Sequence, residues 1–138
     1  MILSATIVPA GCTTLMLECL ADMAAMFPEQ LWGQDASASR ALIRESIEQN
    51  DRFELIVRTD SGEIAGIAVA AVEHDPHVGM CFSVQWRVVF PQYRHSTCNI
   101  KLHRHLVHLA RKLGCPVMAF TRRIGEGKYM LDYKRLEK

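Results

Sequence analysis

The sequence of 138 residues lacks any long uncharged apolar run, although hydrophobic residues make up 49% of it. A membrane-spanning helix needs about 20 predominantly apolar residues in succession, so none is predicted. The apolar start MILSATIVPAG has no basic segment before it, which favours a first strand over a secretion signal. We therefore expect one domain over residues 1–138, in the cytoplasm and without membrane contact.

The cysteines also lack a pattern. There are five, and no two are spaced as C-x-x-C, which argues against both a disulfide framework and a zinc ribbon. We expect them to be buried free thiols in a reducing compartment. Among His103, His105 and His108, only the last two share a flank of a helix, so no metal site is predicted.

Acidic residues are scarce in the second part of the chain. Residues 1–86 hold 4 Lys and Arg against 12 Asp and Glu, whereas residues 87–138 hold 12 against 3. This asymmetry suits an anionic partner for the basic part and a cationic partner for the acidic part, unless the two parts pair with each other. Nucleic acid is one such anion, but it is not favoured, because the basic stripe lacks interleaved aromatics for stacking on bases.

The residue patterns predict nine elements in the order β-α-α-β-β-β-α-β-β. Strands are expected over residues 2–8, 53–59, 64–74, 79–90, 117–123 and 128–136. Helices are expected over 15–26, capped by Thr13 or Thr14, over a stretch from Ser37 or Ser39 to about Gln49, and over 99–113. In the strand 79–90, strict alternation would place Met80, Phe82, Val84, Trp86 and Val88 on one face. The fold class is mixed α/β (α+β), with one mostly antiparallel mixed sheet and helices on both faces.

The stretch FPQYRHSTCNIKLHRHL, residues 90–106, joins an expected strand to an expected helix through a polar turn without glycine. The free N–H groups of a helix start attract phosphate. Arg94 adds a charged fork, and Ser96 and Thr97 add hydroxyl groups. The alternative is that Ser96 or Thr97 only caps the helix.

This stretch resembles the main motif of the GNAT-type N-acetyltransferase superfamily, written R-x-x-G-x-G/A. Arg94 falls on the arginine, whereas Thr97 and Asn99 fall on the two glycine positions. The expected helix matches the family further at Leu102, Ala110 and Gly114. The order of elements matches over nearly the whole chain.

The resemblance implies that acetyl-CoA binds where two neighbouring strands splay apart, and that an amine is the acceptor. It assigns cofactor contacts to Trp86, Val88, Val89, Arg94, His95, Ser96, Thr97, Cys98 and Asn99. A hairpin stands where the family has a fourth helix and two more strands. This compact ending resembles small phage-encoded members, which would place the protein in a host cytoplasm or a virion.

Acyl transfer to an amine needs a base, and backbone N–H groups to stabilise the oxyanion. Glu73 and His74, at the end of a central strand, are the candidates for the base, and Glu73 is preferred, although a solvated carboxylate at a strand end is the plainer interpretation. The family uses a tyrosine to protonate the leaving thiolate. Tyr133 is the candidate here, with Tyr129 on the same strand face and core packing as the alternative.

Three hypotheses follow. The leading one is an acetyl-CoA-dependent N-acetyltransferase that acts on a primary amine by direct transfer. The second is a GNAT-fold protein without catalysis, which serves as an interaction or virion-associated component. The third is a basic module that associates with nucleic acid.

Overall fold

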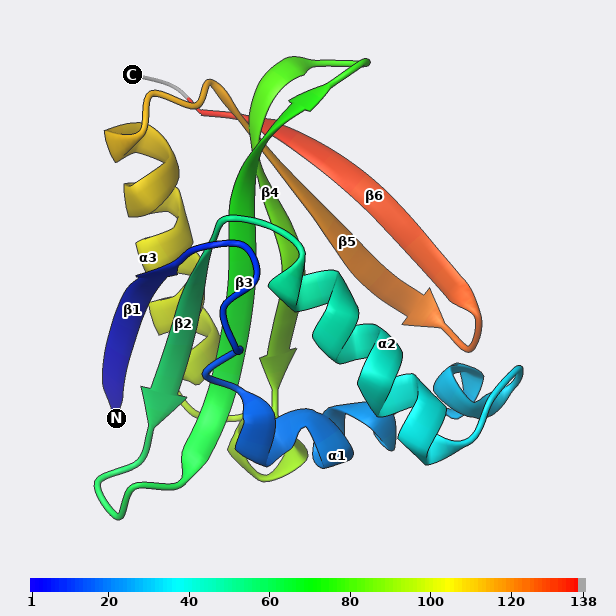
Figure 1. The fold of residues 1–138 in the computed structure, drawn as a ribbon. Coiled ribbons are helices and arrows are strands. Elements are labelled where there is room, and N and C mark those ends of the chain that lie inside the picture. Colours follow the sequence, from blue (N-terminus) through cyan, green and yellow to red (C-terminus); the bar gives the residue numbers. More distant parts are fainter. Residues whose placement is uncertain (137–138) are drawn as a thin grey trace.

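The computed structural model describes residues 1–136, which form one six-stranded sheet in the order β1-β2-β3-β4-β5-β6 (Figure 1). The strands are β1 (Ile2–Val8), β2 (Arg52–Arg58), β3 (Ile64–Asp75), β4 (Gly79–Val89), β5 (Val117–Gly125) and β6 (Lys128–Arg135). The helices are α1 (Leu20–Ala24), α2 (Ala36–Glu48) and α3 (Cys98–Lys112), with short 3-10 turns η1 (Leu17–Cys19), η2 (Pro28–Leu31) and η3 (Pro91–Tyr93). Every neighbouring pair of strands is antiparallel except β4 and β5. The expected fold class and element order are confirmed.

Helices cover both faces of the sheet (Figure 1). Helix α3 packs on one face, where Leu102 and Leu106 meet Phe82 and other strand residues. Helices α1 and α2 pack on the other face, where Met23 and Ile47 belong to a second buried cluster. We call these the α3 face and the α2 face. No helix among residues 1–136 is long and apolar enough to cross a membrane.

The first helical segment is shorter than predicted. Residues 15–26 form η1 and α1 rather than one continuous helix. The buried Thr14 hydroxyl accepts from the Met16 N–H at 3.2 Å, as a cap does, and donates to Glu54 Oε1 at 2.5 Å. The predicted caps of α2 were wrong, since the Asp35 carboxylate accepts from the Ala38 N–H at 2.8 Å. The Asp35 carboxylate bonds more strongly than a serine hydroxyl would, because its charge assists the bond.

A buried ion pair ties the segment before α1 to β2. Arg52 Nε lies 3.0 Å from Glu54 Oε2, and neither side chain is exposed. Arg52 also donates to the carbonyl of Cys12 at 2.8 Å, and Glu54 accepts from the N–H of Leu15 at 3.1 Å. These bonds satisfy charges that would otherwise be costly to bury.

A β-bulge at Gln85 changes which way β4 presents its side chains. Val69 pairs with Trp86 and Ala70 pairs with Val84, so Gln85 has no partner on β3. Phe82 and Val84 therefore pack on the α3 face, whereas Trp86 and Val88 pack on the α2 face. The prediction that all of these share one face was wrong, because one extra residue reverses the alternation of a strand.

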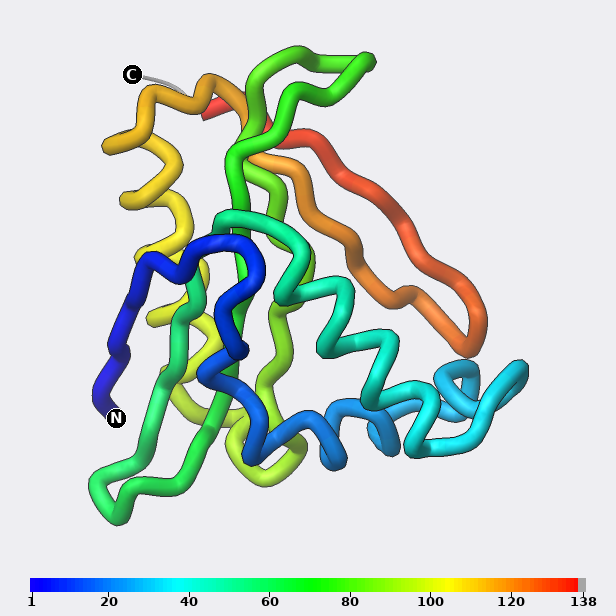
Figure 2. The backbone as a smooth tube through the Cα atoms, in the orientation of Figure 1, coloured from blue at the N-terminus to red at the C-terminus, as the bar shows by residue number. Residues whose placement is uncertain are grey.

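Strands β4 and β5 separate just beyond this bulge. They pair only over Cys81–Val84 and Val117–Phe120. Beyond Phe120, β5 and the part of β6 that pairs with it swing away from β4, as the tube trace shows (Figure 2). The rung between Val84 and Phe120 is the apex of the opening.

Candidate functional site

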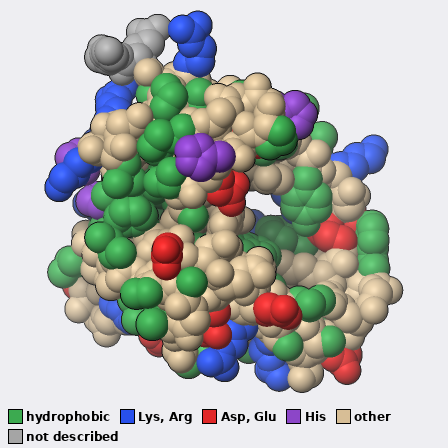
Figure 3. All heavy atoms as spheres, turned by 45° about the horizontal axis from the view of Figure 1, so that its top comes forward, with side chains coloured by type: hydrophobic (Ala, Val, Ile, Leu, Met, Phe, Trp, Pro, Cys, Tyr) green, Lys and Arg blue, Asp and Glu red, His purple; other side chains and the backbone are tan. Residues whose placement is uncertain are grey.

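The splayed strands enclose a cleft of about 520 Å³. Its walls come from β4 between Gln85 and Val89, from β5 between Thr121 and Arg123, and from Tyr129 of β6. Met26, Phe27 and Gln30 reach it from the segment that joins α1 to α2. In the space-filling view the molecule is hollowed between its body and the β5–β6 hairpin (Figure 3).

A clamp, made of Phe27, Glu29 and Trp32 against the hairpin, fixes the far wall of the cleft. The Glu29 carboxylate accepts from Arg123 Nε at 3.0 Å and from the Gly127 N–H at 2.5 Å. The Arg123 guanidinium lies 4.5 Å from the centre of the Phe27 ring. These bonds hold the pKa of Glu29 below its ordinary value, with the Gly127 N–H as the largest cause. Trp32 packs closely over Gly127, so close that a Cβ there would lie 2.6 Å from the indole.

The backbone of β4 has a free edge along the cleft. The Phe90 N–H donates to the carbonyl of Ala65, which fixes the direction of this end of the strand. Because backbone groups alternate in direction along a strand, those of Arg87 and Val89 point away from β3 and into the opening. Consistent with this, the Val89 carbonyl is approached by Arg94 Nε at 3.5 Å.

The start of α3 also has free donors. The Ser96 hydroxyl accepts from the Cys98 N–H at 3.2 Å and donates to the Tyr93 carbonyl at 2.5 Å. Thr97 occupies the cap position but makes no side-chain cap bond. The N–H groups of Thr97, Asn99 and Ile100 bond to no other residue in the described chain. A helix start with three free N–H groups is suited to an anion.

The missing glycines do not distort this turn. Thr97 has φ −77° and ψ 0°, and within residues 1–136 only glycines have positive φ. Both Thr97 and Asn99 are exposed, and Asn99 lines the cleft. A glycine does matter nearby, at Gly66 of β3, where a Cβ would lie 2.5 Å from Cys98 Sγ. That contact lets the start of α3 lie close against the sheet.

The structure brings together only part of the predicted site. Trp86, Val88, Val89, Arg94 and Asn99 line the cleft, with Val88 and Trp86 directing their backbone groups toward β3. The side chains of His95, Ser96, Thr97 and Cys98 do not line it. Cys98 is fully buried, and burial raises the pKa of its thiol.

The two predicted catalytic residues lie outside the cleft. Glu73 is exposed, and its Oε1 accepts from Gln85 Nε2 at 3.3 Å. Gln85 lines the cleft, so Glu73 lies directly behind a residue of the cleft wall. The Tyr133 hydroxyl donates to Asp75 at 2.9 Å, and this bond raises the pKa of Tyr133. The pKa of Asp75 is lowered, first by the His77 N–H and then by the bond from Tyr133.

The sequence patterns did not indicate Gln30, Arg87 and Arg123 as residues of the cleft wall. The Arg122–Arg123 pair on a predicted strand was the one available signal.

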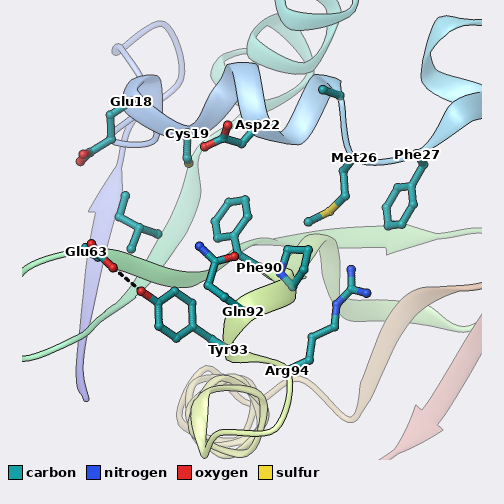
Figure 4. Close-up of a pocket in the computed structure, with 13 residues that line it drawn as sticks. Glu18, Cys19, Asp22, Met26, Phe27, Glu63, Phe90, Gln92, Tyr93 and Arg94 are labelled. Carbon is teal, nitrogen blue, oxygen red and sulfur yellow. Dashed lines mark hydrogen bonds between the residues drawn. The ribbon is translucent and has the colours of Figure 1, made fainter.

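A second cavity, of about 750 Å³, lies on the other side of Arg94, Met26 and Phe27. Glu18, Asp22 and Glu63 line it, so we call it the acidic pocket (Figure 4). The Tyr93 hydroxyl donates to Glu63 in this pocket, and this bond is the main cause that raises the pKa of Tyr93.

Four of the five cysteines are buried free thiols, as expected: Cys19, Cys81, Cys98 and Cys115. Cys12 is exposed.

Comparison with solved structures identifies the architecture. A protein of Pyrococcus furiosus that is named as an acetyl transferase superposes with a TM-score of 0.67 at 12% identity, over 89% of this chain and 85% of that one. The chain has the GNAT acetyltransferase fold. No family model and no curated protein sequence matches it.

Aminoglycoside acetyltransferases are among the structures that share this fold. AAC(6')-Ih of Acinetobacter baumannii gives a TM-score of 0.61 at 16% identity, over 91% of this chain and 82% of that one. AAC(6')-Iy, solved with the bisubstrate analogue CoA-S-monomethyl-acetylneamine, gives a TM-score of 0.57 at 18% identity, over 92% of this chain and 84% of that one. The GNAT resemblance read from residues 88–114 is thus confirmed at the level of the fold.

Proposed function

We propose that the protein is a CoA-dependent N-acyltransferase, with acetyl-CoA as the expected donor, which transfers its acyl group directly to a primary amine. The observation that carries this proposal is the splay of β4 from β5, with a free backbone edge that leads from the start of α3 to the bulge at Gln85. The GNAT fold supports it, since the structures that share the fold include acetyltransferases.

The residues at the start of α3 fit the phosphates of CoA. The free N–H groups of Thr97, Asn99 and Ile100 point out of a 15-residue helix whose first turn has no acidic residue. Arg94 supplies a positive charge beside them. The cleft-facing groups of Arg87 and Val89 fit the amides of the pantetheine arm. When bound, acetyl-CoA supplies an activated acyl group as a thioester.

The bulge supplies a candidate oxyanion donor. Gln85 is the extra residue of the bulge and has no register partner on β3 or β5, and we propose that its backbone N–H faces the apex of the cleft. A fixed, free N–H stabilises the negative charge that develops on a carbonyl oxygen under attack. We therefore assign the reaction centre to the apex of the cleft.

Glu73 remains the proposed base, acting through water. Its carboxylate does not line the cleft, but the amide of Gln85 bonds to it and does line the cleft. Because a carboxylate only accepts hydrogen bonds, Gln85 must turn its amide nitrogen toward Glu73. Gln85 thus positions Glu73 beside the wall near which the acceptor amine would lose its proton.

For the proton that the leaving thiolate takes up, we favour Tyr129 over Tyr133. Tyr129 lines the cleft, whereas the Tyr133 hydroxyl is already donated to Asp75. Replacing each tyrosine by phenylalanine distinguishes them. Tyr129→Phe should lower kcat with little change in donor affinity, and Tyr133→Phe should leave kcat near that of the wild type.

The proposal is tested by calorimetric titration of acetyl-CoA and free CoA into the wild type and Arg94→Ala. Binding that Arg94→Ala weakens, together with thiol release in the presence of amines, is the expected result. No heat at millimolar ligand would reject the acyltransferase and favour an interaction protein without catalysis. Salt-dependent DNA binding without CoA binding would favour the nucleic-acid hypothesis instead.

A further inference from the structure

Arg87 lies in the splayed part of β4 and turns its side chain to the α3 face. Its Nη1 lies 3.3 Å from Nδ1 of His103 on α3, and its guanidinium carbon lies 5.7 Å from the centre of the Phe120 ring. Phe120 is the last residue of β5 that pairs with β4. The guanidinium therefore sits beside the apex of the cleft, which Arg87 also lines.

Among the residues that the structure describes, no carboxylate neutralises this guanidinium. The elements β4, β5 and α3 contain no Asp or Glu. The acidic residue of β6 on the same face, Asp132, already binds Arg122 at 2.5 Å. Within residues 1–136, Arg87 has no ion-pair partner. Burial lowers the pKa of Arg87, as expected for a cation held out of water.

His103 does not offset the charge. An arginine only donates hydrogen bonds, so Nδ1 of His103 must accept and the ring must be neutral. Burial, followed by the charges of Arg87 and Lys134, lowers the pKa of His103. The pair thus presents one positive charge to the cleft at neutral pH. A partly buried cation without a counter-ion is costly, and an anionic group of a ligand would remove that cost.

We propose that Arg87 binds an anionic oxygen of the acyl donor at the apex of the cleft, and that this oxygen is the carboxylate of a dicarboxylic acyl group such as succinyl. The inference rests on the proposed function and replaces the acetyl group, the donor expected there, with a dicarboxylic acyl group. The phosphates of CoA have their own donors at the start of α3, at the opposite end of the cleft wall from Phe120. A carboxylate at the end of a short acyl chain is the anion suited to the apex.

The reaction balances without any further reactant. The acceptor nitrogen forms a bond to the thioester carbonyl carbon, and the carbon–sulfur bond breaks. One amine proton leaves to the base, and the thiolate takes up one proton to give free CoA. The distal carboxylate stays unchanged in the amide product, so Arg87 holds a group that does not react.

Titrations with acyl-CoA pairs test the proposal. Succinyl-CoA and butyryl-CoA have the same number of acyl carbons and differ in the terminal charge. We expect the wild type to bind succinyl-CoA about tenfold more tightly or better, the effect of one charge-assisted hydrogen bond. Arg87→Gln should abolish this preference and leave the affinity for acetyl-CoA unchanged. Arg104→Gln, an exposed neighbour on α3, removes the same charge and should keep the preference.

The remaining outcomes are separable. If Arg87→Gln weakens free CoA and every acyl-CoA equally, the anion is a phosphate of CoA and the carboxylate assignment is overturned. If acetyl-CoA binds but Arg87→Gln changes no affinity, the anion site is overturned while the proposed function stands. If no CoA compound binds the wild type, the anion site and the proposed function are both overturned.

A thermal melt tests the unpaired charge without any ligand. Arg87→Met should raise Tm, because it removes a partly buried charge, and a lower Tm would contradict the argument.

Discussion

The cleft and the acidic pocket share Met26, Phe27 and Arg94 as a common wall, yet they carry opposite charge. Of the described residues, four arginines and no carboxylate line the cleft, whereas Glu18, Asp22 and Glu63 line the acidic pocket. Only one ion pair within residues 1–136, Arg123–Glu29, joins the basic part of the chain to the acidic part. The two parts therefore do not neutralise each other. The charge asymmetry of the sequence appears in the fold as two neighbouring cavities, one whose charged residues are arginines and one whose charged residues are mainly carboxylates.

The largest expected effect comes from breaking the ion pair that anchors the wall of the acidic pocket. Glu54→Gln leaves the buried Arg52 without a counter-ion and weakens the bonds to Thr14 and Leu15, just before η1 and α1. We expect the free energy of unfolding to fall by about 3–5 kcal/mol in urea titrations. Glu18→Gln is the control, because its pair with Arg58 is exposed and should cost about 1 kcal/mol or less. Equal losses in both variants would contradict this.

A smaller loss is expected where the start of α3 meets the sheet. In Gly66→Ala the new methyl group would meet Cys98 Sγ at 2.5 Å and the Val88 carbonyl at 3.0 Å. Overpacking of this kind costs about 1–3 kcal/mol of unfolding free energy and would shift the cleft end of the helix. CoA binding should therefore weaken as well. Gly33→Ala is the control, since nothing lies within 4 Å of its Cβ, and it should change neither quantity.

How far the sequence predicts this molecule depends on the range of the interactions. The hairpin at Asp60–Gly62, the helix that ends before Gly114 and the order of elements follow from local patterns, and the structure has all of them. The bulge at Gln85 does not, because an alternating run gives no sign of one extra residue. The charge state of Arg87 depends on what β5, β6 and α3 bring near it, and these contacts span long stretches of chain. Asp35, which caps α2 where serine was expected, is a different case: its bond to the Ala38 N–H is local, and both Asp and Ser are preferred cap residues, so the local pattern did not separate them.

Reversing the charge at the basic end tests the contrast between the cavities directly. Asn99→Asp places a carboxylate beside the free N–H groups of α3, where it would compete with the phosphates of CoA and repel them. Calorimetry should show CoA affinity lower by about tenfold, with a weaker salt dependence. Asp22→Asn changes the charge of the acidic pocket instead and should leave that affinity within about twofold. A large effect of Asp22→Asn would mean that both cavities hold the donor.

The smallest effect expected is a loosening of the clamp in acid. The pKa of Glu29 is lower in the folded protein than in the unfolded chain, first through the Gly127 N–H and then through Arg123. Its stabilising contribution is therefore present above the unfolded pKa and is lost as the pH falls through the folded one, below about pH 4. Trp32 packs on Gly127 and is 66% exposed, so its fluorescence should report the change. Glu29→Gln should remove this acid transition and leave the acidic pocket unaffected, because within residues 1–136 the Glu29 carboxylate bonds only to Arg123 and Gly127 of the hairpin. A transition that persists in Glu29→Gln would assign it to another carboxylate, and the clamp would then not be the acid-sensitive part of the cleft.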